Sequence, residues 1–266
     1  ISQSAVSQSI KVLEKKLNQP LFIRSTKKVQ LTPEGEILLK HVEPAMNLIR
    51  QGENQLLDSN SLNGGQPRIG ASDTICRYFL VPYLEQFHKA FPGTHIKVTN
   101  ATSIRCVELL RSGQVDLIVV NFPNSHLDSM FTSTTIHDFQ DVFIADETFK
   151  ELRGRKMSYQ ELLKYPILML DKNSTTSEYL HALFQQHQLD LVPEVELSSN
   201  DLLIDLARIG LGIAFIPDYC LTKMPEDLFL LEMKEELPKR KLALAYNSHV
   251  PVSKAAVEFM HLLQPV

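Results

Sequence analysis

The chain of 266 residues is 44% hydrophobic and 22% charged, a globular balance that excludes a fibre and a wholly disordered chain. No apolar run approaches the roughly 18 residues that span a bilayer, and the first residues form no basic-then-apolar leader, so we expect neither membrane insertion nor secretion. The net charge of −4 divides unevenly, because residues 1–40 carry +4 and the remainder carries −8. A basic arm on an acidic body favours nucleic-acid binding, although a solvated charged surface would give the same imbalance.

Residues 2–17 predict an amphipathic helix. Its apolar side chains recur every three or four residues, at Val6, Ile10, Leu13 and Leu17, and Ser2 is a suitable N-cap. About 120° around the helix lies a polar face formed by Gln3, Ser4, Ser7, Gln8 and Lys11. Glutamine pairs with adenine, serine with any base edge, and lysine with guanine or phosphate. We therefore predict that this face contacts the major groove of DNA, the alternative being an ordinary solvent-facing surface.

Residues 20–31 predict a β-hairpin with a basic tip. Two short apolar stretches flank Arg24, Lys27 and Lys28, which would lie against phosphates or a minor groove and supply affinity rather than base choice. A basic hairpin beside a helix that contacts the major groove is typical of a winged-helix domain.

A long helix is predicted to begin at Thr32, where a capping hydroxyl precedes Pro33 and Glu34. Apolar or small residues then recur in a seam suited to pairing with a second copy of the chain: Leu38, Val42, Ala45, Ile49, Gly52 and Leu56. Pro44 should kink this helix. The alternative to self-association is that the seam packs against the rest of the protein.

From residue 68 onward, short apolar strands alternate with helices, which predicts βαβ units and two α/β lobes. The strands are expected at residues 68–71, 96–100, 116–121, 142–145, 167–170, 194–197 and 212–216. The helices are expected at residues 74–90, 104–112, 177–188 and 201–209.

Three stretches resemble the LysR-type transcriptional regulators, a bacterial family. Residues 2–39 read SQSAVSQSIKVLEKKLNQPLFIRSTKKVQLTPEGEILL, residues 113–123 read GQVDLIVVNFP, and residues 210–219 read GLGIAFIPDY. The resemblance covers essentially the whole chain. It implies an α/β protein with a partial winged helix-turn-helix and a long linker helix, followed by a two-lobed, periplasmic-binding-protein-like (type II) effector domain. The first helix and most of the second helix of the family's DNA-binding unit would precede Ile1.

The resemblance also implies a division of the chain into parts. The recognition helix and wing would occupy residues 1–31, the linker or dimerisation helix 32–59, and a hinge 60–67. Effector lobe I would comprise residues 68–139 and 246–266, and lobe II residues 140–245. The chain would cross between the lobes twice, with a strand over residues 242–246 returning and a helix over residues 252–263 closing lobe I.

Small polar residues follow several predicted strands. At these strand ends the N-termini of the next helices direct free N–H groups toward a bound ligand. Because several such strand-to-helix junctions should meet at one edge of the sheets, we expect the ligand to be a small anion such as a carboxylate. Helix capping alone is the alternative explanation for the polar residues at any single junction. The resemblance likewise places the effector between the lobes. The predicted ligand-binding residues are Ser72, Asp73, Thr102, Ser103, Asn121, Phe122, Ser199 and Asn200. Asp73 opposes an anion unless Arg77, four residues later, neutralises it.

Nothing in the sequence indicates catalysis. Hydrolase, phosphate-loop, zinc-protease and dinucleotide motifs are absent, and neither the nine histidines nor Cys76, Cys106 and Cys220 show metal-ligand spacing. We predict no catalytic residue, no metal and no cofactor, with buried free thiols in a reducing cytoplasm; a redox sensor is the minor alternative.

The sequence therefore predicts a cytoplasmic, ligand-responsive bacterial transcriptional regulator. Its partners would be double-stranded promoter or operator DNA, a small-molecule effector, and further copies of itself in a homodimer or homotetramer, with no membrane partner. The alternative is a two-lobed solute-binding protein that delivers a small molecule to a transporter. Residues 1–58 argue against that alternative, since a solute binder has no use for a basic winged segment and a dimerising helix.

Overall fold

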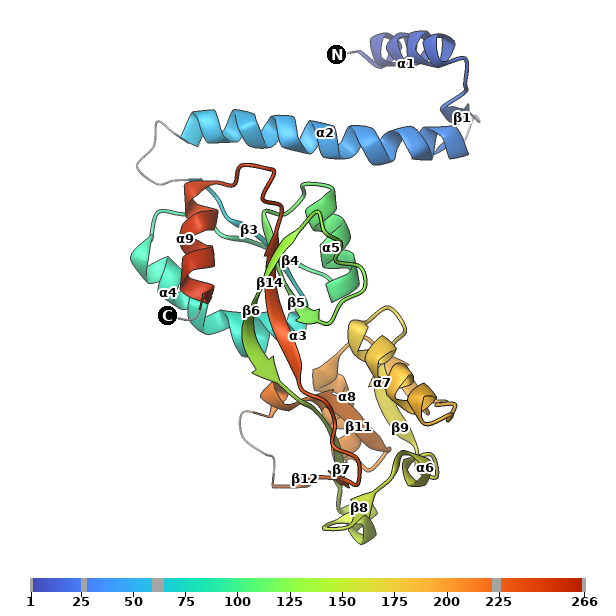
Figure 1. Ribbon diagram of the computed structural model, residues 1–266. Coiled ribbons are helices and arrows are strands. Elements are labelled where there is room, and N and C mark those ends of the chain that lie inside the picture. Colours follow the sequence, from blue (N-terminus) through green and yellow to red (C-terminus); the bar gives the residue numbers. More distant parts are fainter. Residues whose placement is uncertain (1, 25–27, 59–64, 222–225, 265–266) are drawn as a thin grey trace. The chain divides into compact units, whose positions relative to one another are not determined.

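The computed structural model describes residues 2–24, 28–58, 65–221 and 226–264, and it divides into two compact units, Ile1–Asn54 and Gln55–Val266. Figure 1 traces the elements in chain order. Lys27 and residues 60–64 of the expected hinge lie outside the described residues. None of the helices in the described ranges combines the length and the apolar character that crossing a bilayer requires.

The first unit contains the expected helix, hairpin and start of the long helix. Helix α1 spans Gln3–Leu17, is capped by the hydroxyl of Ser2, and ends at Asn18, whose φ of 51° is left-handed. Strand β1 (Phe22–Arg24) pairs antiparallel with β2 (Val29–Leu31), and α2 (Pro33–Asp58) continues past Pro44 without interruption. Val42 and Ile49 of the expected seam are exposed in this chain, so the pairing of α2 with a second copy stays a prediction.

The side chains of Glu14 and Thr32 fix the turn between α1 and α2 through four hydrogen bonds. The carboxylate of Glu14 accepts hydrogen bonds from the backbone N–H groups of Leu21 (2.8 Å) and Phe22 (3.2 Å). Thr32 donates its hydroxyl to the Pro20 carbonyl at 2.7 Å and accepts the N–H of Gly35 at 3.0 Å. A Cβ at position 35 would lie 2.2 Å from the Leu21 carbonyl oxygen, so only glycine allows this approach.

The second unit holds two lobes, each built on a five-stranded sheet (Figure 1). In lobe I the strand order is β4-β3-β5-β14-β6, formed by Lys97–Asn100, Arg68–Ala71, Leu117–Phe122, Arg240–Tyr246 and Thr132–Phe139. In lobe II the order is β10-β9-β11-β7-β12, formed by Val195–Leu197, Ile167–Leu170, Ile213–Pro217, Asp141–Asp146 and Leu228–Leu230. A short pair, β8 (Lys156–Met157) and β13 (Glu232–Met233), joins lobe II.

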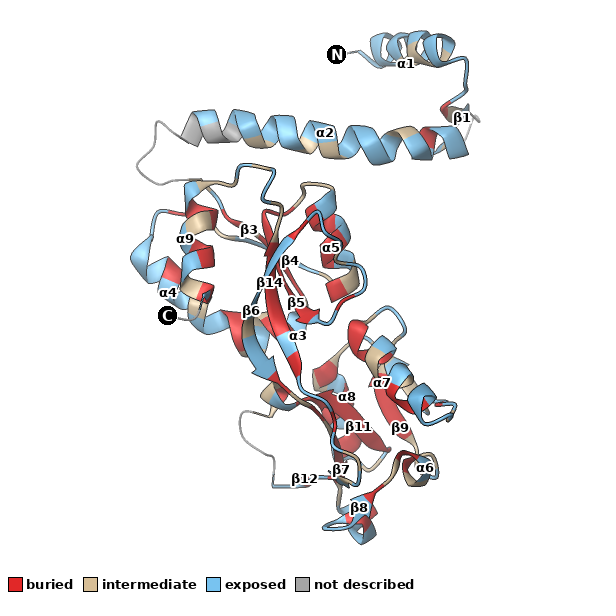
Figure 2. Cartoon of the chain, in the orientation of Figure 1, coloured by how far each residue is buried: buried red, intermediate tan, exposed pale blue. Residues whose placement is uncertain are grey.

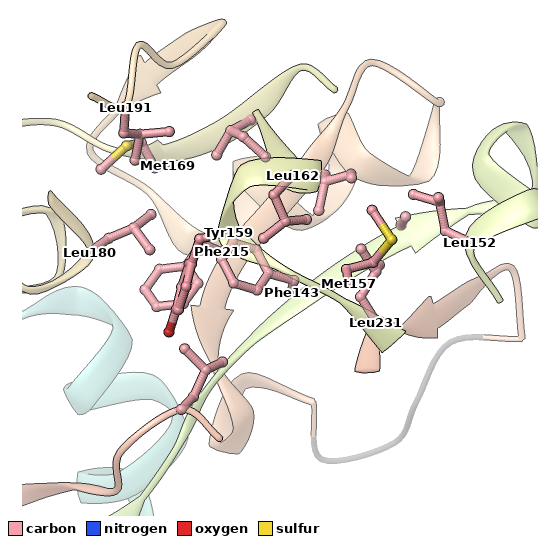
Figure 3. Packing of buried hydrophobic residues seen from close by; sticks show 14 of the residues in the cluster. Phe143, Leu152, Met157, Tyr159, Leu162, Met169, Leu180, Leu191, Phe215 and Leu231 are labelled. Atoms are coloured by element: carbon pink, nitrogen blue, oxygen red, sulfur yellow. The ribbon is translucent and has the colours of Figure 1, made fainter. Parts of the chain in front are cut away.

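Helices cover both faces of each sheet, as parallel strands require. In lobe I, α4 (Val81–Ala90) and α9 (Lys254–Leu263) pack on one face and α5 (Ser103–Arg111) on the other. In lobe II, α6 (Tyr159–Leu162) and α7 (Thr175–Gln186) cover one face and α8 (Asn200–Arg208) the other. Figure 2 shows the central strands as the buried layer, and Figure 3 shows the lobe II core around Phe143 and Phe215.

The structure confirms all seven strands predicted from residue 68 onward and most of the helices. The helix expected at residues 74–90 is not continuous, because a short turn (α3, Asp73–Ile75) and a π-helical turn over Cys76–Leu80 precede α4. Strand β6 was missed because it is a largely exposed edge strand whose sequence, TSTTIHDF, shows no apolar alternation. Edge strands have one unpaired side, so their burial pattern is weak.

The return crossover lies earlier in the chain than the boundary that the resemblance suggested. Strand β14 is hydrogen-bonded to β5 and β6, so residues 240–246 belong to the sheet of lobe I and not to lobe II. The returning strand expected over residues 242–246 is confirmed within β14, which ends at residue 246, so only the lobe boundary at residue 246 was misplaced. An apolar strand gives no sign in its own sequence of which sheet it joins, and this explains the error.

A buried ion pair lies where the two connections cross between the lobes. Arg240, the first residue of β14, donates to Asp141, the first residue of β7, at 2.7 Å, and the exposed fractions of the two side chains are 1% and 0%. The guanidinium lies over the rings of Phe139 and Tyr179, at 5.3 and 4.6 Å from their centroids. Burial raises the pKa of the Asp141 carboxyl, while Arg240 opposes that rise.

Removing one member of this pair should destabilise the protein strongly. We expect Asp141→Ala to lower the free energy of unfolding by about 3–5 kcal/mol, because Arg240 would be left as an uncompensated buried charge. Urea unfolding of the two proteins measures the difference. The matched control is Glu108→Ala, which breaks the exposed Arg105–Glu108 pair and should cost at most about 1 kcal/mol. Equal losses in both variants would contradict a structural role for the buried pair.

Candidate functional site

A cavity of about 240 Å³ lies between the two lobes, at the carboxyl ends of six strands. This is the position where open α/β sheets bind ligands. Its volume is below the ~300–1,000 Å³ of sites for drug-sized molecules, so it suits a small metabolite. The lining residues are Ser72, Asp73, Thr74, Asn100, Ala101, Thr102, Ser103, Asn121, Leu170, Asp171, Ser174, Thr175, Thr176, Ser198, Ser199, Asn200, Pro217 and Tyr219.

Three helices of nine residues or more, α5, α7 and α8, begin at this cavity. Each starts with a hydroxyl N-cap that accepts one backbone N–H: Thr102 from Arg105 at 3.3 Å, Ser174 from Ser177 at 3.0 Å, and Ser199 from Leu202 at 3.3 Å. A cap of this kind accepts one of the four first-turn N–H groups, and the helix dipole places partial positive charge there. The three helix N-termini therefore contribute partial positive charge to the cavity wall.

Among the described residues that line the cavity there is no lysine, arginine or histidine, but there are two carboxylates. Asp73 accepts a hydrogen bond from the side-chain amide of Asn100 at 3.3 Å, and Asp171 accepts the backbone N–H of Asn173 at 2.9 Å. Arg77 does not neutralise Asp73 as expected, because its guanidinium pairs at 3.4 Å with Asp201 of lobe II. The two carboxylates oppose a highly charged anion.

Side-chain contacts join the two lobes around the cavity. Asn121 of lobe I donates its amide to the hydroxyls of Thr175 (3.5 Å) and Thr176 (3.4 Å), and Asn200 of lobe II donates to Thr74 at 2.9 Å. Thr176 also accepts a hydrogen bond from Arg240 at 3.2 Å, which connects the cavity wall to the buried ion pair.

Tyr78 provides a further contact between the lobes. Its hydroxyl donates to Asp201 at 2.5 Å, and its ring packs against the lobe II core formed by α8 and neighbouring strands. Burial and this hydrogen bond raise the pKa of Tyr78. The phenol therefore stays protonated and can serve as a donor across the interface.

Seven of the eight predicted ligand-binding residues line the cavity, and Phe122 does not. Phe122 follows Asn121 in β5, so its side chain points to the opposite face of the strand, and it is 38% exposed. The prediction omitted Asn100 and Tyr219 from the cavity wall. Asn100 could have been found by the same reasoning, since it is the last residue of β4.

The predicted DNA-contacting residues of α1 lie on its accessible surface. Gln3, Ser4, Gln8 and Lys11 are exposed, and Ser7 is partly exposed. Arg24 ends β1, and Lys28 is exposed just before β2. Their contacts with DNA stay predictions.

The thiols do not have the surroundings of a redox sensor. All three cysteines are free. Burial raises the pKa of Cys106 to about 12, and burial together with Asp73 raises that of Cys76 to about 11. Burial also raises the pKa of Cys220. Reactive cysteines have lowered pKa values, so the raised values favour structural thiols. Within the described ranges, no group of three or more histidine, cysteine, aspartate or glutamate side chains could hold a metal ion.

Two family models match the chain. The model described as "LysR substrate binding domain" matches residues 60–266, and "Bacterial regulatory helix-turn-helix protein, lysR family" matches residues 1–36. A relative named "Probable RuBisCO transcriptional regulator", from Gracilaria tenuistipitata var. liui, is 29% identical over 267 residues. That alignment covers 97% of this chain and 86% of the relative.

Two solved structures share the fold. The regulatory domain of CcmR from Synechocystis PCC6803, solved in complex with 2-PG, has a TM-score of 0.68 and 23% identity, over 75% of this chain and 95% of that one. Full-length CbnR complexed with its target DNA has a TM-score of 0.69 and 14% identity, over 99% of this chain and 90% of that one.

The native thiols should react slowly with a thiol reagent at neutral pH. Raised pKa values leave little thiolate, and the thiolate is the reacting form. We expect 5,5′-dithiobis(2-nitrobenzoic acid) to modify all three cysteines quickly in urea but slowly in the folded chain, as followed by absorbance. A cysteine that reacts in the folded chain as fast as in urea would revive the redox-sensor alternative.

Proposed function

Because the chain belongs to the LysR family of bacterial transcriptional regulators and is itself a ligand-responsive regulator of this kind, we propose that its effector is a small anion bound between the two lobes. The observation that carries this proposal is the convergence of the N-termini of α5, α7 and α8 on one cavity. The CcmR regulatory domain, solved in complex with 2-PG, supports a ligand for the matching region of this chain.

We propose that the effector acts by changing how the lobes meet. A ligand shifts a conformational equilibrium only if it binds one arrangement more tightly than the other. The cavity is lined from both lobes, and Asn121, Asn200 and Tyr78 already join them. A molecule that bridges the two walls would favour the closed arrangement and, through it, alter the assembly of copies and promoter binding.

The proposed division of labour follows the chain. Residues 1–31 bind DNA through α1 and the β1–β2 hairpin, residues 32–59 mediate self-association, and residues 60–67 form a hinge. CbnR, solved in complex with its target DNA, supports DNA as the partner. Relatives named as transcriptional regulators support a cytoplasmic protein that is not an enzyme.

The anionic effector is tested by adding a carboxylate to the cavity wall without removing a helix cap. Aspartate caps a helix as well as serine does, so Ser174→Asp should fold normally. A like charge a few ångströms from the ligand should weaken binding of a carboxylate at least about tenfold. Thermal shift with acetate, lactate and glycerate measures binding, and sedimentation of the full-length protein reports assembly.

The matched control is Ser253→Asp, the same substitution at the N-cap of α9, which does not line the cavity. It should leave carboxylate binding unchanged. If Ser174→Asp binds carboxylates as tightly as the unaltered chain, the anion is not bound at this cavity.

The DNA interface predicts two different mutant phenotypes. Lys28→Ala should weaken binding to specific and random DNA alike and lower the salt slope by about 1, because a phosphate contact is lost. Gln3→Ala should reduce the preference for the specific site, because a base contact is lost. Fluorescence anisotropy of a full-length protein at several salt concentrations measures both, with Lys150→Ala of lobe II as the control. Equal loss on both DNAs for both variants would contradict this assignment.

A further inference from the structure

Two buried side-chain amides, one from each lobe, belong to residues that line the cavity, and the oxygen of each is buried without a partner among the described residues. Asn121 lies near the end of β5 and is 9% exposed, and Asn200 is the first residue of α8 and is 4% exposed. Both line the cavity. Each donates its Nδ2 to a threonine of the opposite lobe, and the Oδ1 of each has no hydrogen-bond partner among the described residues.

A buried acceptor without a donor is unfavourable, so the bound ligand should supply the missing donors. The oxygens of an anion are acceptors only and cannot fill this role. A ligand that satisfies the whole cavity therefore carries hydrogen-bond donors as well as a negative charge.

Hydroxyl donors fit the cavity better than an ammonium group. An ammonium group would pair with the carboxylates of Asp73 and Asp171, which can accept more than the one hydrogen bond described for each, and would leave the two amide oxygens without a donor. The two unpartnered oxygens are amide carbonyls, which a neutral hydroxyl satisfies without the cost of burying a second charge.

Resting on the anionic effector proposed above, we propose that the effector is a small hydroxylated monocarboxylic acid. Its hydroxyl groups donate to Oδ1 of Asn121 and Oδ1 of Asn200, while its carboxylate lies at the helix N-termini. Because the two amides belong to opposite lobes, a ligand that satisfies both connects lobe I to lobe II. Two hydroxyls would then bind and close the lobes better than one.

A three-carbon series separates the two parts of the proposal. Isothermal titration of the full chain at constant ionic strength compares propionate, lactate and glycerate, which carry no, one and two hydroxyls. We expect about a fivefold gain in affinity per hydroxyl, the usual size of one hydrogen bond. Glycerol, which has hydroxyls but no charge, should bind much more weakly than glycerate.

The outcomes are distinct. Propionate binding as tightly as glycerate would overturn the hydroxylated ligand and leave the anionic effector standing, since amides turned by 180° would then present Nδ2 to the acid. Alanine binding more tightly than lactate would replace the hydroxyl by an ammonium group. Glycerol binding as tightly as glycerate would overturn the anionic effector itself, and absence of binding by the whole series would overturn both.

A matched pair of variants locates the effect. Asn200→Leu removes one unpartnered acceptor at nearly constant size and should abolish the preference for glycerate over lactate. Because the variant also loses the hydrogen bond to Thr74, the ratio of the two affinities is compared rather than their absolute values. Asn124→Leu, at another buried asparagine of lobe I that does not line the cavity, should keep the full preference. Should either variant fail to fold, the ligand series on the unaltered chain decides the matter.

Discussion

The geometry of the two lobes depends on the ion pair between Arg240 and Asp141, which joins the two connections at the point where they leave one sheet for the other. Gln140, between β6 and β7, adds a 2.5 Å hydrogen bond from its side chain to the carbonyl of Leu237 on the other connection. The two crossings are thus joined by a buried ion pair and a partly buried hydrogen bond, and such contacts are specific in geometry even where their net stabilisation is small.

The same ion pair reaches the ligand cavity through Thr176, which accepts hydrogen bonds from both Arg240 and Asn121. A change in the position of Asn121 on ligand binding would alter the hydroxyl that the guanidinium contacts. Nε and Nη2 of Arg240 have no partner among the described residues, so the guanidinium retains donors that a rearranged neighbour can accept. These contacts connect the cavity wall to the crossing strands.

Sequence patterns predicted the buried strands and the helix starts well, because both depend on local features. The run from Leu117 to Val120 is fully buried, and Ser72, Thr102 and Ser199 cap helices as their residue types suggest. Seven cavity residues followed from the rule that parallel strands end at one edge together with the resemblance to the LysR family, which alone suggested Asn121. What could not be predicted depends on distant partners: the polar edge strand β6, the sheet joined by β14, and the pairing of Arg77 with Asp201 instead of Asp73.

The π-helical turn over Cys76–Leu80 makes the contact between the lobes sensitive to chain length. A π turn holds an additional residue compared with an α turn, so loss of one residue there would restore a regular helix. Tyr78 and Arg77, which contact Asp201, would then rotate by about 100° around the helix axis and lose their partner. Natural insertions and deletions should therefore be tolerated in the surrounding loops but rare within this single turn.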